Sequence, residues 1–231
     1  MNIREVSLSL ADDLFVQSQT LAPWTVNYVD LEESLAVGSI AQEKLAHGGI
    51  MYALAGLSDT ERDAHIYQRD SSSWSLSTLS FLSKDHWPDL IAGAYFCSQA
   101  ALFTVEELML TNSHAHEQLR LVRSEQILHV NHWRKWASML FGNIETKSEM
   151  VTALEFAVSR CGDLIPQGSD HDAIFDLWSM AVSSDFLNWG IASPPIVERV
   201  ARIHGGDRVV QLLGELSTAR SENGRSNYAV Y

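Results

Sequence analysis

Apolar residues recur along most of this chain at intervals of three and four, the spacing that places side chains on one face of an α-helix. Few prolines and glycines interrupt the pattern. It predicts long helices at residues 5–22, 31–57, 88–111 and 114–141. Helices of this length with short or moderate connections predict an all-α antiparallel four-helix bundle.

The C-terminal third continues the helical pattern in shorter segments. We expect additional helices there at residues 146–161, 171–189, 195–204 and 207–219. Residues 220–231 are expected to be a frayed tail. The whole chain, 1–231, is therefore predicted to be one domain, with its core bundle over about 5–141 and the C-terminal helices over about 146–219.

Several residues mark helix boundaries. Asp30 followed by Glu33 predicts the N-terminal cap of the second helix, and Pro88 predicts the first turn of the third. Thr146 with Glu149 has the spacing of a second capping box. Residues 59–75 are rich in Asp, Arg and Ser, and the pattern predicts no helix in them.

Composition narrows the functional class. The chain has 231 residues, 46% of them hydrophobic, which suffices for a buried core. Its net charge of −13 makes a nucleic acid or an anionic membrane a poor partner. No transmembrane segment or signal peptide is recognised, and two cysteines make no disulfide framework. The expected location is the cytoplasm.

An internal echo relates the second and fourth long helices. Glu43 and His47 share a Glu-x-x-x-His spacing with Glu125 and His129, 82 residues later. Each histidine lies on an otherwise apolar stripe, with a polar residue three positions before it, Lys44 or Gln126. Burying such groups costs free energy unless they are paired, so their matched placement needs a physical reason.

Ferritin-like di-iron proteins supply such a reason. They use a Glu-x-x-His motif on each of two helices and one further Glu from each of the other two. In this chain Lys44 and Gln126 stand at the two motif Glu positions, and only His47 and His129 remain. The third helix offers Ser98 or Cys97, and the first offers Leu14, flanked by Asp13 and Gln17. The sequence predicts a ferritin-like bundle with vestigial di-iron positions at Lys44, His47, Ser98, Gln126 and His129.

Lys44 would place a cation where a metal ion belongs. Our hypothesis is that it replaces the metal charge and pairs with a nearby carboxylate, which could be Asp13, Glu43 or Glu125. The simpler interpretations stay open. Each histidine alone fits a hydrogen-bonded core residue, and Glu43 and Glu125 fit surface charges beside the stripes.

Several segments together resemble a known family. They are Leu10-Ala11-Asp12-Asp13, Leu31-Glu32-Glu33 with Leu35-Ala36, the run from Ile40 to His47, Ile91-Ala92 with Tyr95-Phe96, and the helix with Glu125 and His129. In order and spacing they are similar to PaaC, a subunit of the bacterial phenylacetyl-CoA ring-epoxidase, over residues 8–160. The resemblance implies a ferritin-like subunit that has lost its iron ligands and stabilises a catalytic PaaA subunit.

The resemblance also carries expectations about chemistry. The complex uses dioxygen and delivered electrons to epoxidise the ring of phenylacetyl-CoA, with di-iron in the PaaA-like partner and no cofactor in this chain. Lys44 and Gln126 stand where PaaA has ligating carboxylates. The alternatives are a PaaC-like paralogue that serves another oxygenase, and a helical binding protein unrelated to oxygenases. A third is an active metalloenzyme with Glu43, His47, Glu125, His129 and a carboxylate from Asp13 or Glu106 as ligands.

Overall fold

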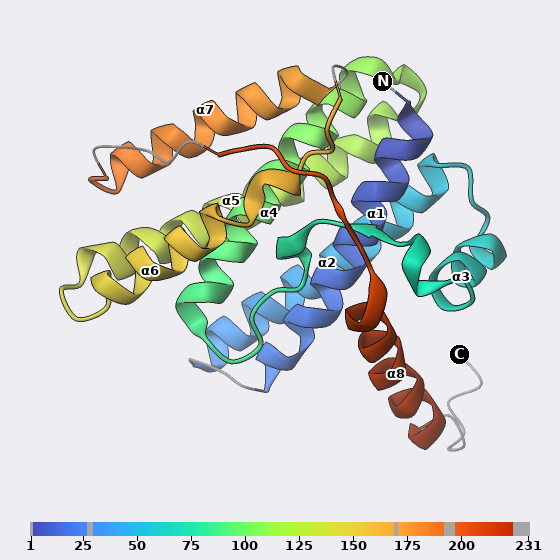
Figure 1. Ribbon diagram of the computed structural model, residues 1–231, viewed down its shortest axis with the longest axis horizontal. Helices are drawn as coiled ribbons and strands as arrows, with labels where there is room; N and C mark the ends of the chain where they lie inside the picture. Colours follow the sequence, from blue (N-terminus) through green and yellow to red (C-terminus); the bar gives the residue numbers. More distant parts are fainter. Residues whose placement is uncertain (1, 27–29, 169–170, 192–196, 224–231) are drawn as a thin grey trace.

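The computed structural model of the chain describes residues 2–26, 30–168, 171–191 and 197–223. It confirms the all-α ferritin-like fold (Figure 1). The four long helices are α1 (Ile3–Leu21), α2 (Leu31–Leu54), α4 (Trp87–Thr111) and α5 (His116–Gly142). Helix α1 packs along α2, and α4 packs along α5. Every helix in the described part of the chain is too short or too polar to cross a membrane.

Shorter elements surround the bundle. Helices α6 (Lys147–Val158) and α7 (Asp172–Asn188) pack against α4. Helix α8 (Gly206–Asn223) lies apart from these two helices (Figure 1). The remaining elements are α3 (Asp59–Tyr67), the two-residue strands β1 (Ser75–Leu76) and β2 (Ile203–His204), and five 3₁₀ turns at Ala22–Thr25, Ser71–Ser73, Thr78–Ser80, Ser113–Ala115 and Cys161–Asp163. The strands pair antiparallel, with Ser75 opposite His204.

The predicted start of α2 is confirmed, and its predicted end is wrong by three residues. The Asp30 carboxylate accepts a hydrogen bond from the Glu33 amide (2.7 Å), so it caps the helix. The helix stops at Leu54 because Gly56 adopts a positive φ of 84°. The Leu57 amide then bonds back to the Tyr52 carbonyl (3.1 Å), which closes the helix end in the Schellman manner.

Helix α3 was missed because its polar composition hides it. Its start, however, carries a capping box in which Ser58 and Glu61 exchange hydrogen bonds. The opposite error occurs at Thr146, where the predicted capping box does not form. The Thr146 hydroxyl donates to the Leu140 carbonyl (2.9 Å), and α6 begins one residue later without a side-chain cap.

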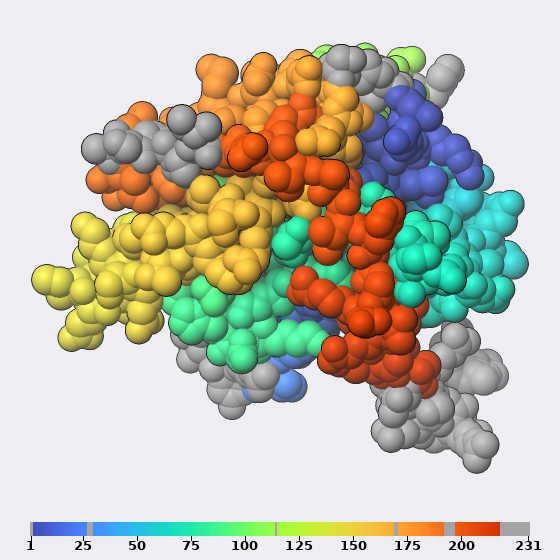
Figure 2. All heavy atoms as spheres, viewed as in Figure 1, coloured from blue at the N-terminus to red at the C-terminus, as the bar shows by residue number. Residues whose placement is uncertain are grey.

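The predicted helix at 195–204 is wrong over the part that is described. Residues 197–202 form an extended strap that lies across the surface toward β2 (Figure 2). Its Val200 amide donates to the Gly162 carbonyl (3.1 Å), and a side chain at Gly162 would collide with the Glu198 carbonyl. Residues 192–196, and 224–231 of the predicted tail, lie outside the described residues, whereas α8 continues to Asn223.

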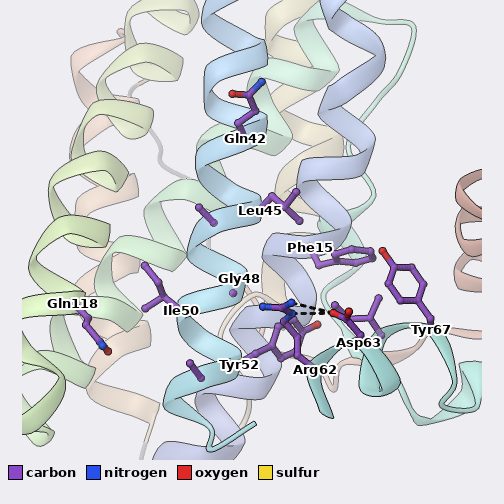
Figure 3. A pocket seen from close by; sticks show the side chains of 14 residues that line it. Phe15, Gln42, Leu45, Gly48, Ile50, Tyr52, Arg62, Asp63, Tyr67 and Gln118 are labelled. Carbon is purple, nitrogen blue, oxygen red and sulfur yellow. Dashed lines mark hydrogen bonds and ion pairs between the residues drawn. The ribbon is translucent and has the colours of Figure 1, made fainter. Parts of the chain in front are cut away.

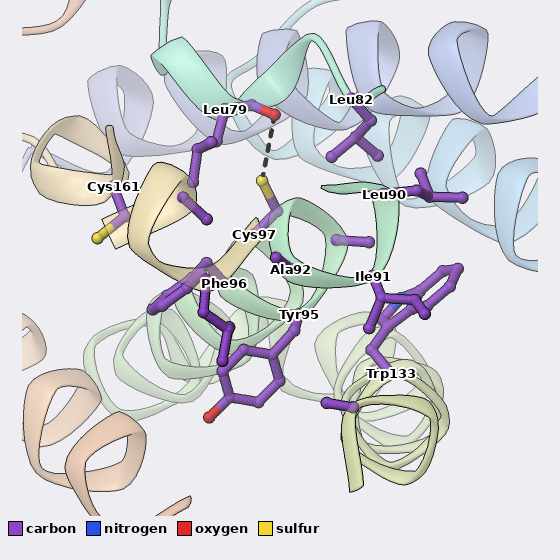
Figure 4. Packing of buried hydrophobic residues seen from close by; sticks show 14 of the residues in the cluster. Leu79, Leu82, Leu90, Ile91, Ala92, Tyr95, Phe96, Cys97, Trp133 and Cys161 are labelled. Carbon is purple, nitrogen blue, oxygen red and sulfur yellow. Dashed lines mark hydrogen bonds between the residues drawn. The ribbon is translucent and has the colours of Figure 1, made fainter. Parts of the chain in front are cut away.

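Two apolar clusters make up the core. One surrounds α4 and includes Ile91, Tyr95 and Phe96 of that helix together with Trp133 of α5 (Figure 4). The other joins α1 and α2 through residues such as Leu14 and Met51. Helices α1 and α2 approach closely at Gly48, where an added Cβ would lie 3.4 Å from the Ala11 carbonyl oxygen. This close approach fixes how side chains from α1 meet those from α2.

Arg202 joins the strap to the bundle. Its guanidinium pairs with the Asp13 carboxylate of α1, and the two side chains are only 7% and 5% exposed. It also donates to the carbonyls of Asp163, Leu164 and Ser75. Burial raises the pKa of Asp13, and the Arg202 charge opposes that rise.

We expect Arg202→Met to lower the free energy of unfolding by about 3–5 kcal/mol, because it leaves a buried carboxylate unpaired. Urea denaturation followed by circular dichroism measures this change. Lys84→Met is the matched control, since its partner Glu215 is about half exposed, and it should cost at most about 1 kcal/mol. Equal losses of unfolding free energy in the two variants would contradict the stabilising role of the Arg202–Asp13 pair.

Candidate functional site

Polar side chains meet in the middle of the bundle, where the α1–α2 pair faces the α4–α5 pair. This central polar cluster consists of residues that are at most 2% exposed: Gln17, Lys44, His47, Ser98, Gln126 and His129. Five of them are the positions that the sequence pattern predicts. Gln17 stood out only as a neighbour of Leu14, although Leu10, Leu14, Gln17 and Leu21 share one helical stripe.

Lys44 is the only cation of the cluster. Its Nζ donates to Gln17 Oε1 on α1 (2.9 Å) and to Ser98 Oγ on α4 (3.4 Å). Burial lowers the pKa of Lys44 from 10.5 to about 8, and the nearby Cys97 and Asp13 oppose that shift. The ammonium therefore stays protonated at pH 7.

The predicted direct pair between Lys44 and a carboxylate does not form among the described residues. Each candidate carboxylate has another partner. Asp13 is held by Arg202 and the Ser77 amide, and Glu43 and Glu125 bind the two histidines. The prediction failed because Lys44 reaches across to neutral side chains of α1 and α4.

The two histidines bind glutamates of the opposite helix. His47 on α2 lies 2.5 Å (Nε2 to Oε2) from Glu125 on α5, and His129 on α5 lies 2.6 Å from Glu43 on α2. The ring centroids are 5.8 Å apart. The Glu-x-x-x-His echo in the sequence is thus a pair of crossed interactions, related by the approximate two-fold symmetry of the bundle.

Charge is distributed unevenly across these crossed pairs. The histidine side chains are 1% exposed, whereas Glu125 and Glu43 are 28% and 37% exposed. Burial, Lys44, His47 and His132 lower the pKa of His129 to about 2. Burial also lowers the pKa of His47, although Glu125 opposes the shift. Both rings are neutral at pH 7, and their glutamates keep contact with water.

Gln126 defines the tautomer of His47. Its Nε2 lies 3.0 Å from His47 Nδ1 and can only donate, so Nδ1 accepts and the proton is on Nε2, facing Glu125. The Gln126 Oε1 and His129 Nδ1 atoms are buried and have no hydrogen-bond partner among the described residues. The cluster therefore contains two acceptors that the protein itself does not satisfy.

A third pair extends this seam between α2 and α5. His132 Nε2 lies 2.8 Å from Glu33 Oε1, with the side chains 22% and 10% exposed. From the sequence, Glu33 was predicted only to take part in the N-terminal cap of α2. The spacing of the glutamates along α2 does not predict the contact between Glu33 and His132, because that contact depends on how α2 and α5 cross.

One family comparison identifies the chain's relatives. A family model described as phenylacetic acid catabolic protein, for PaaA and PaaC, matches residues 2–184. The chain belongs to the PaaA/PaaC family. No curated protein matches the chain. The family assigns the chain a place in phenylacetate catabolism.

The central polar cluster does not fit the di-iron group that this fold family can hold. Two iron ions need about four carboxylates, one from each helix, with two histidines. The convergent positions of the four helices here carry Gln17, Lys44, Ser98 and Gln126, which are three neutral groups and a cation. Among the described residues, no three His, Cys, Asp or Glu side chains are grouped so as to hold a metal.

The alternative ligand set is only partly assembled in this PaaA/PaaC chain. Glu43, His47, Glu125 and His129 come together, but as two separate hydrogen-bonded pairs. Asp13 is committed to Arg202, and Glu106 pairs with Arg123. Cys97 is also turned elsewhere, because its thiol donates to the Leu79 carbonyl (3.6 Å; Figure 4).

A separate groove lies on the outer side of α2. It has a volume of about 680 Å³ and runs between α2 and α3, with Phe15, Leu45, Ile50 and Tyr67 among its lining (Figure 3). The Arg62–Asp63 ion pair lies at its α3 side. No member of the central polar cluster lines this groove.

The neutral state of the buried histidines makes the free energy of unfolding depend on pH. Below the unfolded-state pKa of about 6.5, an unfolded histidine binds a proton that folded His129 does not, so the free energy of unfolding falls as pH falls. We expect His129→Gln to remove about 2 kcal/mol of the loss between pH 7 and pH 5. Urea denaturation across that range measures it.

His204→Gln serves as the matched control, because His204 is exposed and outside the cluster. This variant should keep the wild-type pH dependence. A His129→Gln variant with an unchanged slope would contradict the assignment, because it would show that His129 binds protons equally in the folded and unfolded states.

Proposed function

We propose that this chain is a non-catalytic structural subunit of a multicomponent di-iron monooxygenase, the phenylacetyl-CoA epoxidase of phenylacetate catabolism. It stabilises a catalytic PaaA-like subunit, which carries the iron. One observation carries the proposal. At the point where four helices would converge on metal, this chain places a lysine ammonium bonded to Gln17 and Ser98.

Membership of the PaaA/PaaC family supports a place in phenylacetate catabolism. The central polar cluster supports a structural role within the proposed complex. A protein that keeps the bundle but replaces the ligand positions retains the shape and loses the redox centre. Lys44 disfavours a divalent metal by charge, since two like charges a few ångströms apart repel strongly in a buried site. Exposed apolar side chains such as Leu35, Leu121 and Leu128 leave apolar surface on α2 and α5 for subunit contacts.

Co-expression with a PaaA-like chain that has two intact Glu-x-x-His motifs tests the proposal. We expect the two chains to co-purify through size exclusion, with iron bound only to the partner. Measured per assembled complex, Lys44→Met should change turnover by less than about threefold, because a residue outside the reacting centre does not contribute to transition-state binding. Replacing a motif Glu of the partner should abolish turnover.

Metal analysis of the isolated chain is the test that could contradict the proposal. Stoichiometric iron in this chain alone, lost in Glu125→Ala, would overturn the proposal and establish the alternative ligand set. Failure to bind any PaaA-like chain would reject the structural role while leaving the family assignment in place.

A further inference from the structure

In the central polar cluster, some hydrogen-bond donors and acceptors have no partner among the described residues. Lys44 has three N–H donors, and the described residues accept two of them, through Gln17 and Ser98. On the acceptor side, Gln126 Oε1 and His129 Nδ1 have no partner. All three side chains are at most 1% exposed, so bulk water does not reach them.

The approximate two-fold symmetry explains where the imbalance lies. Gln126 and Lys44 occupy matching positions, each three residues before a histidine. Gln126 donates a hydrogen bond to His47 Nδ1 (3.0 Å). The matching bond from Lys44 to His129 Nδ1 is not formed, because the ammonium is drawn toward α1 and α4.

The leftover groups are one donor and two acceptors. A water molecule can donate two hydrogen bonds and accept up to two, so a single water placed between these groups can satisfy all three. Buried waters typically make about three such bonds to groups that are otherwise unsatisfied. A second cation would be repelled by Lys44, and an anion could not donate to Gln126 or His129.

We infer that Lys44 and one bound water, held between Lys44, Gln126 and His129, form a metal-free cationic centre that joins the four helices. The water links α2 to α5, and Lys44 links α2 to α1 and α4. The centre is a binding site for water and excludes divalent metals while Lys44 is present. This inference does not depend on any oxygenase partner.

A crystal structure of the full wild-type chain, grown near pH 7 with cobalt(II) present, tests it. We expect one solvent peak within about 2.7–3.2 Å of Lys44 Nζ, Gln126 Oε1 and His129 Nδ1, without an anomalous signal. An anomalous cobalt peak there would overturn the inference. So would the absence of solvent density between these three groups.

Lys44→Met tests whether the lysine holds the water. The variant removes the only donor to it, so the occupancy of the peak should fall to less than half. Lys135→Met, at an exposed lysine of α5, is the control and should keep the water at full occupancy. A fully occupied water in Lys44→Met would contradict the assigned role, and the wild-type structure remains decisive if that variant does not fold.

Discussion

The fully buried ammonium of Lys44 is the constraint around which the middle of the bundle is arranged. An ammonium in an apolar core is costly, and only hydrogen bonds to oriented groups offset that cost. Gln17 and Ser98 supply them from two other helices. Their neutrality matters, because a carboxylate at either position would attract a metal in competition with the lysine.

Burial lowers the pKa of both histidines, and the positive charge of Lys44 adds to this lowering. Both effects favour neutral rings. A neutral ring can donate from Nε2 to a carboxylate, and Glu43 and Glu125 accept at the edge of the cluster. Because these glutamates stay partly in water, their charges cost little. The crossed pairs therefore close the seam between α2 and α5 without placing carboxylates beside the lysine.

The bundle and most of the cluster could be predicted from the sequence, because both follow from helical periodicity. Lys44 and Gln126 stand out as polar residues on apolar stripes, and the spacing of their histidines repeats. The partner of Lys44 was predicted wrongly, since spacing along one helix does not say which helix a long side chain reaches. The strap at 197–202 was also missed, because its conformation depends on Arg202 reaching Asp13, 189 residues away in sequence.

The matching positions of α2 and α5 differ in one respect, because Lys44 on α2 stands where α5 has Gln126. With glutamine at both motif positions, each amide could donate to its own histidine, and nothing would hold α1 and α4 to the centre. Lysine on α2 adds length and charge, so it bonds across to Gln17 and Ser98. It leaves His129 unsatisfied, which a bound water can correct. Lys44 therefore connects α2 to α1 and α4, and the inferred water extends this connection to α5.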